Sequence, residues 1–111
     1  MNDCIFCKIA AGQIPSDRVY EDEQVVVFRD IYPKAPVHLL MVPRIHVASL
    51  DELAPEHDGL AAHMLRTLPE VARRAGLAEG YRTVINTGRG GGQEVFHLHM
   101  HILGGGSLPG F

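Results

Sequence analysis

A stretch near the C-terminal end, Phe96–Leu103, constrains the fold of this 111-residue chain more than any other. Histidines alternate there in single steps with apolar residues: His97, His99 and His101 stand between Phe96, Leu98, Met100 and Ile102. Successive side chains of a strand point to opposite faces, so the pattern predicts one apolar core face and one face of three imidazoles about 7 Å apart. A free imidazole titrates near pH ~6.5, so such a row is suited to proton transfer at neutral pH.

Four explanations of this histidine row are open. An affinity tag is disfavoured, because tags are contiguous and terminal, whereas these histidines alternate with large apolar residues. The others are a solvated strand face, a three-histidine zinc site with one open coordination position, and catalysis by the imidazoles themselves, in which one ring is a nucleophile and others exchange protons. The segment just before the row favours imidazole catalysis.

That preceding segment, residues 86–95, is rich in glycine. Its glycines are Gly88, Gly90, Gly91 and Gly92. Such a segment can adopt positive φ angles and turn successive backbone N–H groups toward one point, which makes a site for an anion. Asn86 and Gln93 add neutral donors at its two ends. The glycines alone would suggest an ordinary hairpin loop, but directly before three histidines they predict a phosphate site.

The composition excludes several classes of protein. With 46% apolar and 21% charged residues, the chain has the composition of one globular domain. Its net charge is −3 and it has no basic cluster beyond Arg73-Arg74, so a nucleic-acid partner is not expected. The longest apolar stretch, Val37–Pro43, is too short to span a membrane. The first residues do not resemble a signal peptide, which predicts a cytoplasmic protein.

The periodicity of apolar residues predicts an α+β domain. A short helix over Cys4–Ala11 precedes the first strands. The expected strands are Arg18–Glu21, Val25–Arg29, His38–Pro43, Tyr81–Asn86 and Phe96–Leu103. Helical spacing predicts one long helix over Pro55–Ala75, which Pro69 should kink or break in two, with His57 and His63 at the surface. We expect about five strands in a mainly antiparallel sheet, with the long helix packed on it.

The run Gly91–Gly105, which joins the glycine loop to a His-x-His-x-His pattern, resembles the signature of the histidine triad (HIT) superfamily. Together with Asn86 and Asp30 it is most similar to the bacterial type of the HINT branch, the histidine triad nucleotide-binding proteins. Matching segments cover most of the chain: Cys4–Ile9, Phe28–His46 and Tyr81–Gly105. The resemblance implies a HIT-like fold, with residues 1–111 as a single HIT domain, and a homodimer formed through the long helix and an adjoining strand.

The resemblance also implies an activity, the hydrolysis of purine nucleoside 5'-phosphoramidates such as adenosine 5'-monophosphoramidate through a covalent nucleotidyl-histidine. By match, His99 is the nucleophile and the backbone carbonyl of His97 accepts its Nδ1 proton. His101 lies near the phosphate or leaving group, and His38 completes the proton network. No cofactor is required for this chemistry. Two alternatives stay open: hydrolysis of dinucleoside polyphosphates, as in another triad branch, and nucleotide sensing without turnover.

The implied ligand is a purine nucleoside monophosphate or phosphoramidate. Asp30 is expected to accept hydrogen bonds from the ribose hydroxyls. The expected nucleotide contacts further include Ile5, Phe6, Ile9, Phe28, Ile31, Leu40, Asn86, Gly92, Gln93, Glu94 and Val95. Arg29 stands where the best-known animal members have histidine, and Glu94 where they have a serine that contacts the leaving group. These departures affect the preference for the leaving group more than the type of reaction.

Cys4 and Cys7 form a C-x-x-C pair with three interpretations. A redox pair would need a thioredoxin-like context, which the sequence lacks. Two reduced and inert thiols would suit a cytoplasmic protein. Some triad proteins with this pattern hold a structural zinc ion through the pair, a downstream histidine and the first triad histidine. By match, Cys4, Cys7, His46 and His97 would form a Cys₂His₂ zinc site.

Overall fold

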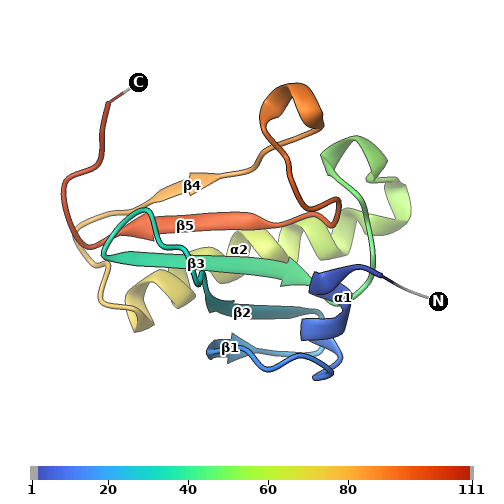
Figure 1. Ribbon diagram of the computed structural model, residues 1–111, viewed down its shortest axis with the longest axis horizontal. Helices are drawn as coiled ribbons and strands as arrows, with labels where there is room; N and C mark the ends of the chain where they lie inside the picture. The colour runs from blue at the N-terminus through green and yellow to red at the C-terminus, as the bar shows by residue number, and fades with distance from the viewer. Residues whose placement is uncertain (1–2, 111) are drawn as a thin grey trace.

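A computed structural model describes residues 3–110 as one antiparallel sheet with a helix on each face (Figure 1). The helices and strands are α1 (Ile5–Ala10), β1 (Arg18–Glu21), β2 (Val25–Arg29), β3 (Val37–Pro43), α2 (Asp58–Arg74), β4 (Arg82–Val84) and β5 (Met100–Gly104). Three 3₁₀ turns join them: Leu50–Glu52, Pro55–His57 and Arg89–Gly91. The strand order is β1-β2-β3-β5-β4, and all four pairings are antiparallel. The predicted α+β class and five-stranded sheet are confirmed.

The two faces of the sheet belong to two separate apolar clusters. Strand β2 alternates between them, because Val25 and Val27 pack toward α2 whereas Val26 and Phe28 pack toward α1. Strand β3 alternates in the same way and is buried along most of its length. Figure 1 shows α2 running behind the sheet, with α1 in front of it where β3 ends. The face that α1 covers holds the candidate site.

Helix α2 decides between two alternatives at Pro69 and changes the expectation for His63. It runs from Asp58 to Arg74 as one helix, so Pro69 does not break it in two, since apolar side chains on both sides of the proline pack on the sheet. His63 is not a free surface group, because its Nε2 atom lies 2.7 Å from Oδ2 of Asp22, on the corner between β1 and β2. This contact joins the first hairpin to the long helix. Across residues 3–110, no helix is both long and apolar enough to cross a bilayer.

The predicted strand Phe96–Leu103 is too long. Strand β5 begins only at Met100, so His97 and His99 lie in the irregular segment that leads into it. The N–H of Leu98 donates to the carbonyl of Val47 (2.7 Å), which holds this segment away from a regular ladder. Phe96 is 47% exposed and does not belong to the core face.

The histidines themselves do not form a solvated row. His97 is 0% exposed and His99 is 7% exposed, so both rings are enclosed by the protein. The alternation still holds from Leu98 to Ile102, whose apolar members pack into the α2 cluster. The imidazoles are thus turned toward the opposite, α1 side of the sheet.

The Asp22 contact predicts a stability effect that depends on pH. Partial burial would raise the pKa of Asp22, but hydrogen bonds from the amides of Gln24 and Val25, from His63 and from Tyr20 outweigh it and lower the pKa to about 2. A lowered pKa stabilises the folded state above the unfolded value of ~3.9, and this contribution disappears as the pH falls through 2. Asp22→Asn should therefore cost about 1–2 kcal/mol of unfolding free energy at pH 7, and the difference should shrink below pH 4.

Urea unfolding of both proteins at pH 7 and pH 3 measures this difference. The matched control is Asp17→Asn, because Asp17 forms an ion pair with Arg29 in which the side chains are 70% and 55% exposed. Such a pair should contribute little. A difference for Asp22→Asn that is the same at both pH values would contradict the assignment.

Candidate active site

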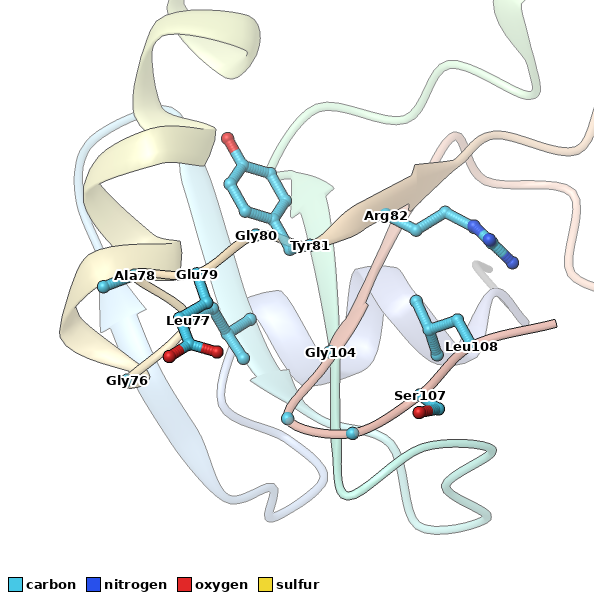
Figure 2. A pocket seen from close by; sticks show the side chains of 12 residues that line it. Gly76, Leu77, Ala78, Glu79, Gly80, Tyr81, Arg82, Gly104, Ser107 and Leu108 are labelled. Carbon is cyan, nitrogen blue, oxygen red and sulfur yellow. The ribbon is translucent and has the colours of Figure 1, made fainter. Parts of the chain in front are cut away.

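A cavity of about 400 Å³ opens between α1, the sheet and the glycine-rich segment. Its walls combine apolar side chains with imidazole and carboxylate groups: Ile5, Phe6, Ile9, Ile14, Pro15, Ser16, Asp17, Phe28, Arg29, Asp30, Ile31, Tyr32, Leu40, Asn86, Gly92, Glu94, Val95, His99 and His101. Another hollow lies between the segment after α2 and the segment after β5 (Figure 2), lined by 76–82 and 104–108. That hollow has no histidine or cysteine in its lining. The first cavity is therefore the candidate active site.

The His99 ring has one chemically defined orientation. Its Nδ1 atom lies 2.7 Å from the backbone oxygen of His97, and a carbonyl can only accept, so Nδ1 carries the proton and donates it. Nε2 of the neutral ring then has a free lone pair. The ring of Phe6 packs edge-on against His99 at 5.0 Å between centroids, which fixes the plane of the imidazole. The contact thus selects the tautomer in which a neutral His99 ring has its lone pair on Nε2, and His99 lies in the wall of the cavity.

His38 and His101 form a second ordered unit. The N–H of Lys34 donates to Nδ1 of His38 (3.0 Å), so the proton of neutral His38 is on Nε2. That Nε2 lies 2.9 Å from Nδ1 of His101 and donates to it. The proton of neutral His101 must then be on its Nε2, the atom not used by His38. One backbone amide thereby determines the tautomers of two rings.

Both rings of this pair are kept neutral. Burial is the main cause that lowers the pKa of His38, and it outweighs the nearby carboxylate of Asp30. Burial also lowers the pKa of His101, to about 4, with help from the neighbouring rings of His99 and His38. At neutral pH the pair is therefore uncharged, and the nearest acceptor for the Nε2–H of His38 is Nδ1 of His101.

Asp30 lies at the mouth of this unit. Its Oδ1 accepts the N–H of Tyr32 (2.8 Å), and its Oδ2 lies 3.4 Å from Nε2 of His38. Its side chain is 18% exposed and belongs to the cavity wall, so lone pairs remain for a ligand. A carboxylate in this position can accept two hydroxyl hydrogens from a sugar.

The glycine-rich segment forms a compact turn beside the cavity. Gly88 (φ +73°) and Gly92 (φ +86°) adopt the left-handed conformations that the sequence predicted. Gln93 does not lie in the cavity wall, in contrast to its expected place among the nucleotide contacts. Its side-chain amide is buried, accepts the N–H of Gly88 (2.8 Å) and donates to the carbonyls of Ala48 (2.7 Å) and Val95 (3.0 Å). Gln93 thus fixes the shape of the loop instead of facing a ligand.

The four expected metal ligands lie together on the other side of His99. Nδ1 of His97 is 3.2 Å from Sγ of Cys4, 3.5 Å from Sγ of Cys7 and 3.2 Å from Nδ1 of His46. Sγ of Cys7 is 3.4 Å from Nδ1 of His46. Zinc at ordinary bond lengths separates tetrahedral nitrogen and sulfur ligands by about 3.3–3.8 Å.

The donor chemistry of this cluster fits zinc as well. His97 donates its Nε2 proton to the carbonyl of Pro43 (2.8 Å), so its Nδ1 is a free lone pair that faces the two thiols. Burial lowers the pKa of His97 and keeps that lone pair unprotonated. Its own backbone oxygen remains engaged with His99. The residues therefore suit a Cys₂His₂ zinc ion without disturbing the active-site hydrogen bond.

The sequence missed part of the cavity. The stretch Ile14–Asp17 was not among the expected nucleotide contacts, yet it forms part of the cavity wall. The apolar Ile14 beside a proline was a signal that this stretch packs inward. The N–H of Lys34 and the carbonyl of Pro43 orient two rings but leave no signal in residue identity, because nearly every residue has both groups.

Comparisons with known proteins agree with this architecture. The family model for the scavenger mRNA decapping enzyme C-terminal binding region matches residues 3–109. Protein HitA of Neisseria gonorrhoeae is 57% identical over 94% of this chain and 97% of its own. The purine nucleoside phosphoramidase of Escherichia coli K12 is 46% identical over 96% of this chain and 90% of its own.

Solved structures give the same result. A histidine triad protein from Clostridium difficile superposes with a TM-score of 0.95 and 45% identity, covering 100% of this chain and 97% of that one. A HIT family hydrolase from Legionella pneumophila superposes with a TM-score of 0.93 and 44% identity, covering 96% of both chains. Fold and site thus define a protein with a histidine triad beside a glycine loop. The chain belongs to the histidine triad superfamily, in its HINT-type branch.

Proposed function

We propose that this protein hydrolyses purine nucleoside 5'-phosphoramidates, such as adenosine 5'-monophosphoramidate, through a covalent bond between His99 and phosphorus. The observation that supports this most directly is the 2.7 Å contact between Nδ1 of His99 and the backbone oxygen of His97. An imidazole attacks only through an unprotonated nitrogen, and this contact reserves Nε2 for that purpose. The purine nucleoside phosphoramidase of Escherichia coli, a relative at 46% identity, supports the choice of substrate.

The cavity offers complementary groups for each part of such a substrate. Phe6 and Phe28 meet at 5.7 Å between ring centroids and form an apolar wall for the base, together with Ile31 and Leu40. The Asp30 carboxylate lies where ribose hydroxyls can donate to it. The backbone N–H groups of Gly88, Gly91, Gly92 and Gln93 donate within the glycine-rich loop. The phosphate oxygens are therefore assigned to the amides of Glu94 and Val95, which follow the loop in the cavity wall.

The reaction then proceeds in two displacements. Nε2 of His99 forms a bond to the α-phosphorus while the P–N bond breaks, and the Nδ1–H bond to His97 stabilises the positive charge that develops on the ring. The departing nitrogen needs a proton, and the Nε2–H of His101, in the cavity wall, is the proposed donor. Water then attacks phosphorus and returns a proton to Nε2 of His101, the P–N bond to His99 breaks, and the nucleoside monophosphate leaves. The balance is phosphoramidate plus water giving monophosphate plus amine.

Replacement of the nucleophile is the direct test. His99→Ala should lower kcat for adenosine 5'-monophosphoramidate by at least about 10³-fold, because the covalent route is lost, while the thermal melting temperature stays close to that of the wild type. Release of the monophosphate, followed by chromatography, measures the rate. Quenched wild-type reactions should contain chains heavier by one nucleotidyl group.

A matched control is His57→Ala, since His57 lies outside the cavity wall. It should keep the wild-type rate. Equal turnover by wild type and His99→Ala would reject the nucleophile. No turnover by the wild type, with binding of adenosine monophosphate retained, would indicate a nucleotide sensor.

We also propose that Cys4, Cys7, His46 and His97 bind a structural zinc ion and that no metal takes part in the chemical step. Zinc bound there would tie the start of α1 to the chain around His46 and His97. Because α1 supplies three residues of the cavity wall (Ile5, Phe6 and Ile9), the tie stabilises the binding site. The reactive Nε2 of His99 stays free of the metal.

Metal analysis tests this zinc site. Protein purified without chelators should contain one zinc ion per chain, and Cys7→Ser should lose it and melt at a lower temperature. Its KM should rise more than its kcat falls, because the helix that lines the cavity is loosened. His57→Ala should keep the zinc. Zinc-free wild type that melts as the loaded protein does, or that loses all turnover at saturating substrate, would contradict a purely structural role.

We propose further that two chains form a homodimer through α2 and β4. Strand β4 is an edge of the sheet, and Leu65 on α2 is 58% exposed, so both elements have surface for a partner. Light scattering should give twice the mass of one chain for the wild type. Leu65→Glu should shift the mass toward one chain, whereas Leu50→Glu, at a 39% exposed position, should not. A wild-type monomer at micromolar concentration would refute the dimer.

A further inference from the structure

The proton on Nε2 of His38 lies between Asp30 and His101, and the proposed reaction gives this proton no role. The Nε2–H of His38 has two acceptors within reach, Nδ1 of His101 at 2.9 Å and Oδ2 of Asp30 at 3.4 Å. His38 is 4% exposed, so water does not offer a third acceptor of comparable access. The Nε2–H of His38 therefore donates to whichever of these two atoms is the stronger hydrogen-bond acceptor.

The three donor atoms are also close enough to hold a metal ion. The amide of Lys34 argues against a metal, because it donates to Nδ1 of His38 at 3.0 Å and thereby keeps the proton on Nε2. A ring bound to metal through Nε2 would have to give up that amide hydrogen bond. The 2.9 Å separation of the two ring nitrogens is that of a hydrogen bond. A proton, rather than a cation, therefore connects these groups.

We infer that the ribose hydroxyls of the substrate control the tautomer of His101 through Asp30 and His38. When hydroxyls donate to Oδ2 of Asp30, that oxygen becomes a weaker acceptor, and the His38 proton points fully at Nδ1 of His101. His101 must then keep its own proton on Nε2, where the leaving nitrogen needs it. Asp30 is thus a positioning residue for the acid as well as a sugar ligand. This inference rests on the proposed phosphoramidase function.

Without the hydroxyls, Asp30 competes for the shared proton. When the His38 proton turns to Oδ2 of Asp30, Nδ1 of His101 loses its hydrogen-bond donor. His101 is then no longer held in the Nε2–H tautomer, and the other tautomer leaves an unprotonated Nε2 in the cavity. A bare nitrogen repels the phosphate oxygens and cannot protonate the amine. Binding of the sugar hydroxyls in this way affects the rate of the chemical step. A ribonucleotide substrate should therefore have a higher kcat than a deoxyribonucleotide substrate, in addition to any difference in KM.

Substrate analogues test this with the unmodified protein. The 5'-phosphoramidates of adenosine, 2'-deoxyadenosine and 2',3'-dideoxyadenosine should give kcat values that fall in that order, by about tenfold or more in total, since correct general acids contribute about 10²–10⁴-fold. Deoxy substrates that raise KM and leave kcat unchanged would overturn the coupling and leave the phosphoramidase function standing. Failure to turn over the adenosine compound would overturn the function itself.

Asp30→Asn separates the coupling from simple sugar binding. The amide keeps an oxygen for the ribose but is a poorer acceptor for the His38 proton. In Asp30→Asn, the ratio of kcat values between ribose and deoxyribose substrates should therefore be smaller than in the wild type. The ratio of their KM values should stay the same. The matched control is Asp51→Asn, which changes an exposed carboxylate outside the cavity wall. It should keep the wild-type ratio of kcat values, and an equal decrease in both variants would contradict the role of Asp30.

A spectroscopic readout does not depend on turnover. Nitrogen-15 shifts of the His101 ring report which nitrogen is protonated. Adenosine monophosphate should move His101 toward the Nε2–H tautomer, and the 2',3'-dideoxy monophosphate should do so less. Identical shifts with both ligands at saturation would overturn the inference, whether or not the protein is a phosphoramidase.

Discussion

The hydrogen bond from Nδ1–H of His99 to the backbone oxygen of His97 is the constraint on which the site depends. A histidine that is free in water exchanges its proton between two nitrogens, so only part of the population is in the form that can attack. Here a carbonyl two residues away in sequence, at 2.7 Å, selects that form before any ligand arrives. Main-chain geometry thus orients the proposed nucleophile, without a carboxylate that would have to be buried beside it.

Backbone groups orient the other rings in the same way. Pro43 accepts from His97, and Lys34 donates to His38, which in turn orients His101. Burial keeps these three rings neutral, so no charged partner is needed to hold them. His97 joins the two halves of this arrangement, because its ring faces the thiols and its carbonyl accepts from His99. The cysteine cluster is therefore connected to His99 through His97, and also through Phe6, whose ring packs against both histidines.

Much of the architecture could be predicted from residue patterns, because alternation and helical spacing directly reflect which side chains are buried. The hairpin Arg18–Arg29, the buried strand β3 and the two helices were predicted to within a residue or a few. The alternation predicted a strand that begins too early. His97 and His99 alternate in direction with their apolar neighbours, but they lie before Met100, where the strand hydrogen bonds begin. Tertiary contacts of Val47 and Pro43 decide that segment, and they lie more than 40 residues away in sequence.

Residue type also predicted the members of the candidate site better than their positions. Histidine, aspartate and cysteine signal chemistry by their side chains. Together with the family resemblance, they identified the histidines and Asp30 of the cavity and the four residues of the cysteine cluster beforehand, whereas Asp17 was missed. Gln93 shows the limit of this reasoning, since the same amide can serve a ligand or a loop, and only the contacts with Gly88, Ala48 and Val95 decide. The tautomers of the histidine rings could not be predicted from the sequence, because they depend on distances to main-chain atoms.

The register of the sheet fixes the number of residues in each central strand, a constraint that the chemistry of the site alone would not impose. Leu40 pairs with His101 on one side and with Phe28 on the other, so one row of residues across three strands sets the distance between the imidazoles and the aromatic wall of the cavity. Deleting a single residue within β3 or β5 would turn every later side chain of that strand to the opposite face and bring methionine where imidazole belongs. Insertions should consequently accumulate around the 3₁₀ turns near residues 50–57, and the strands beneath the cavity should vary in composition but hardly ever in length.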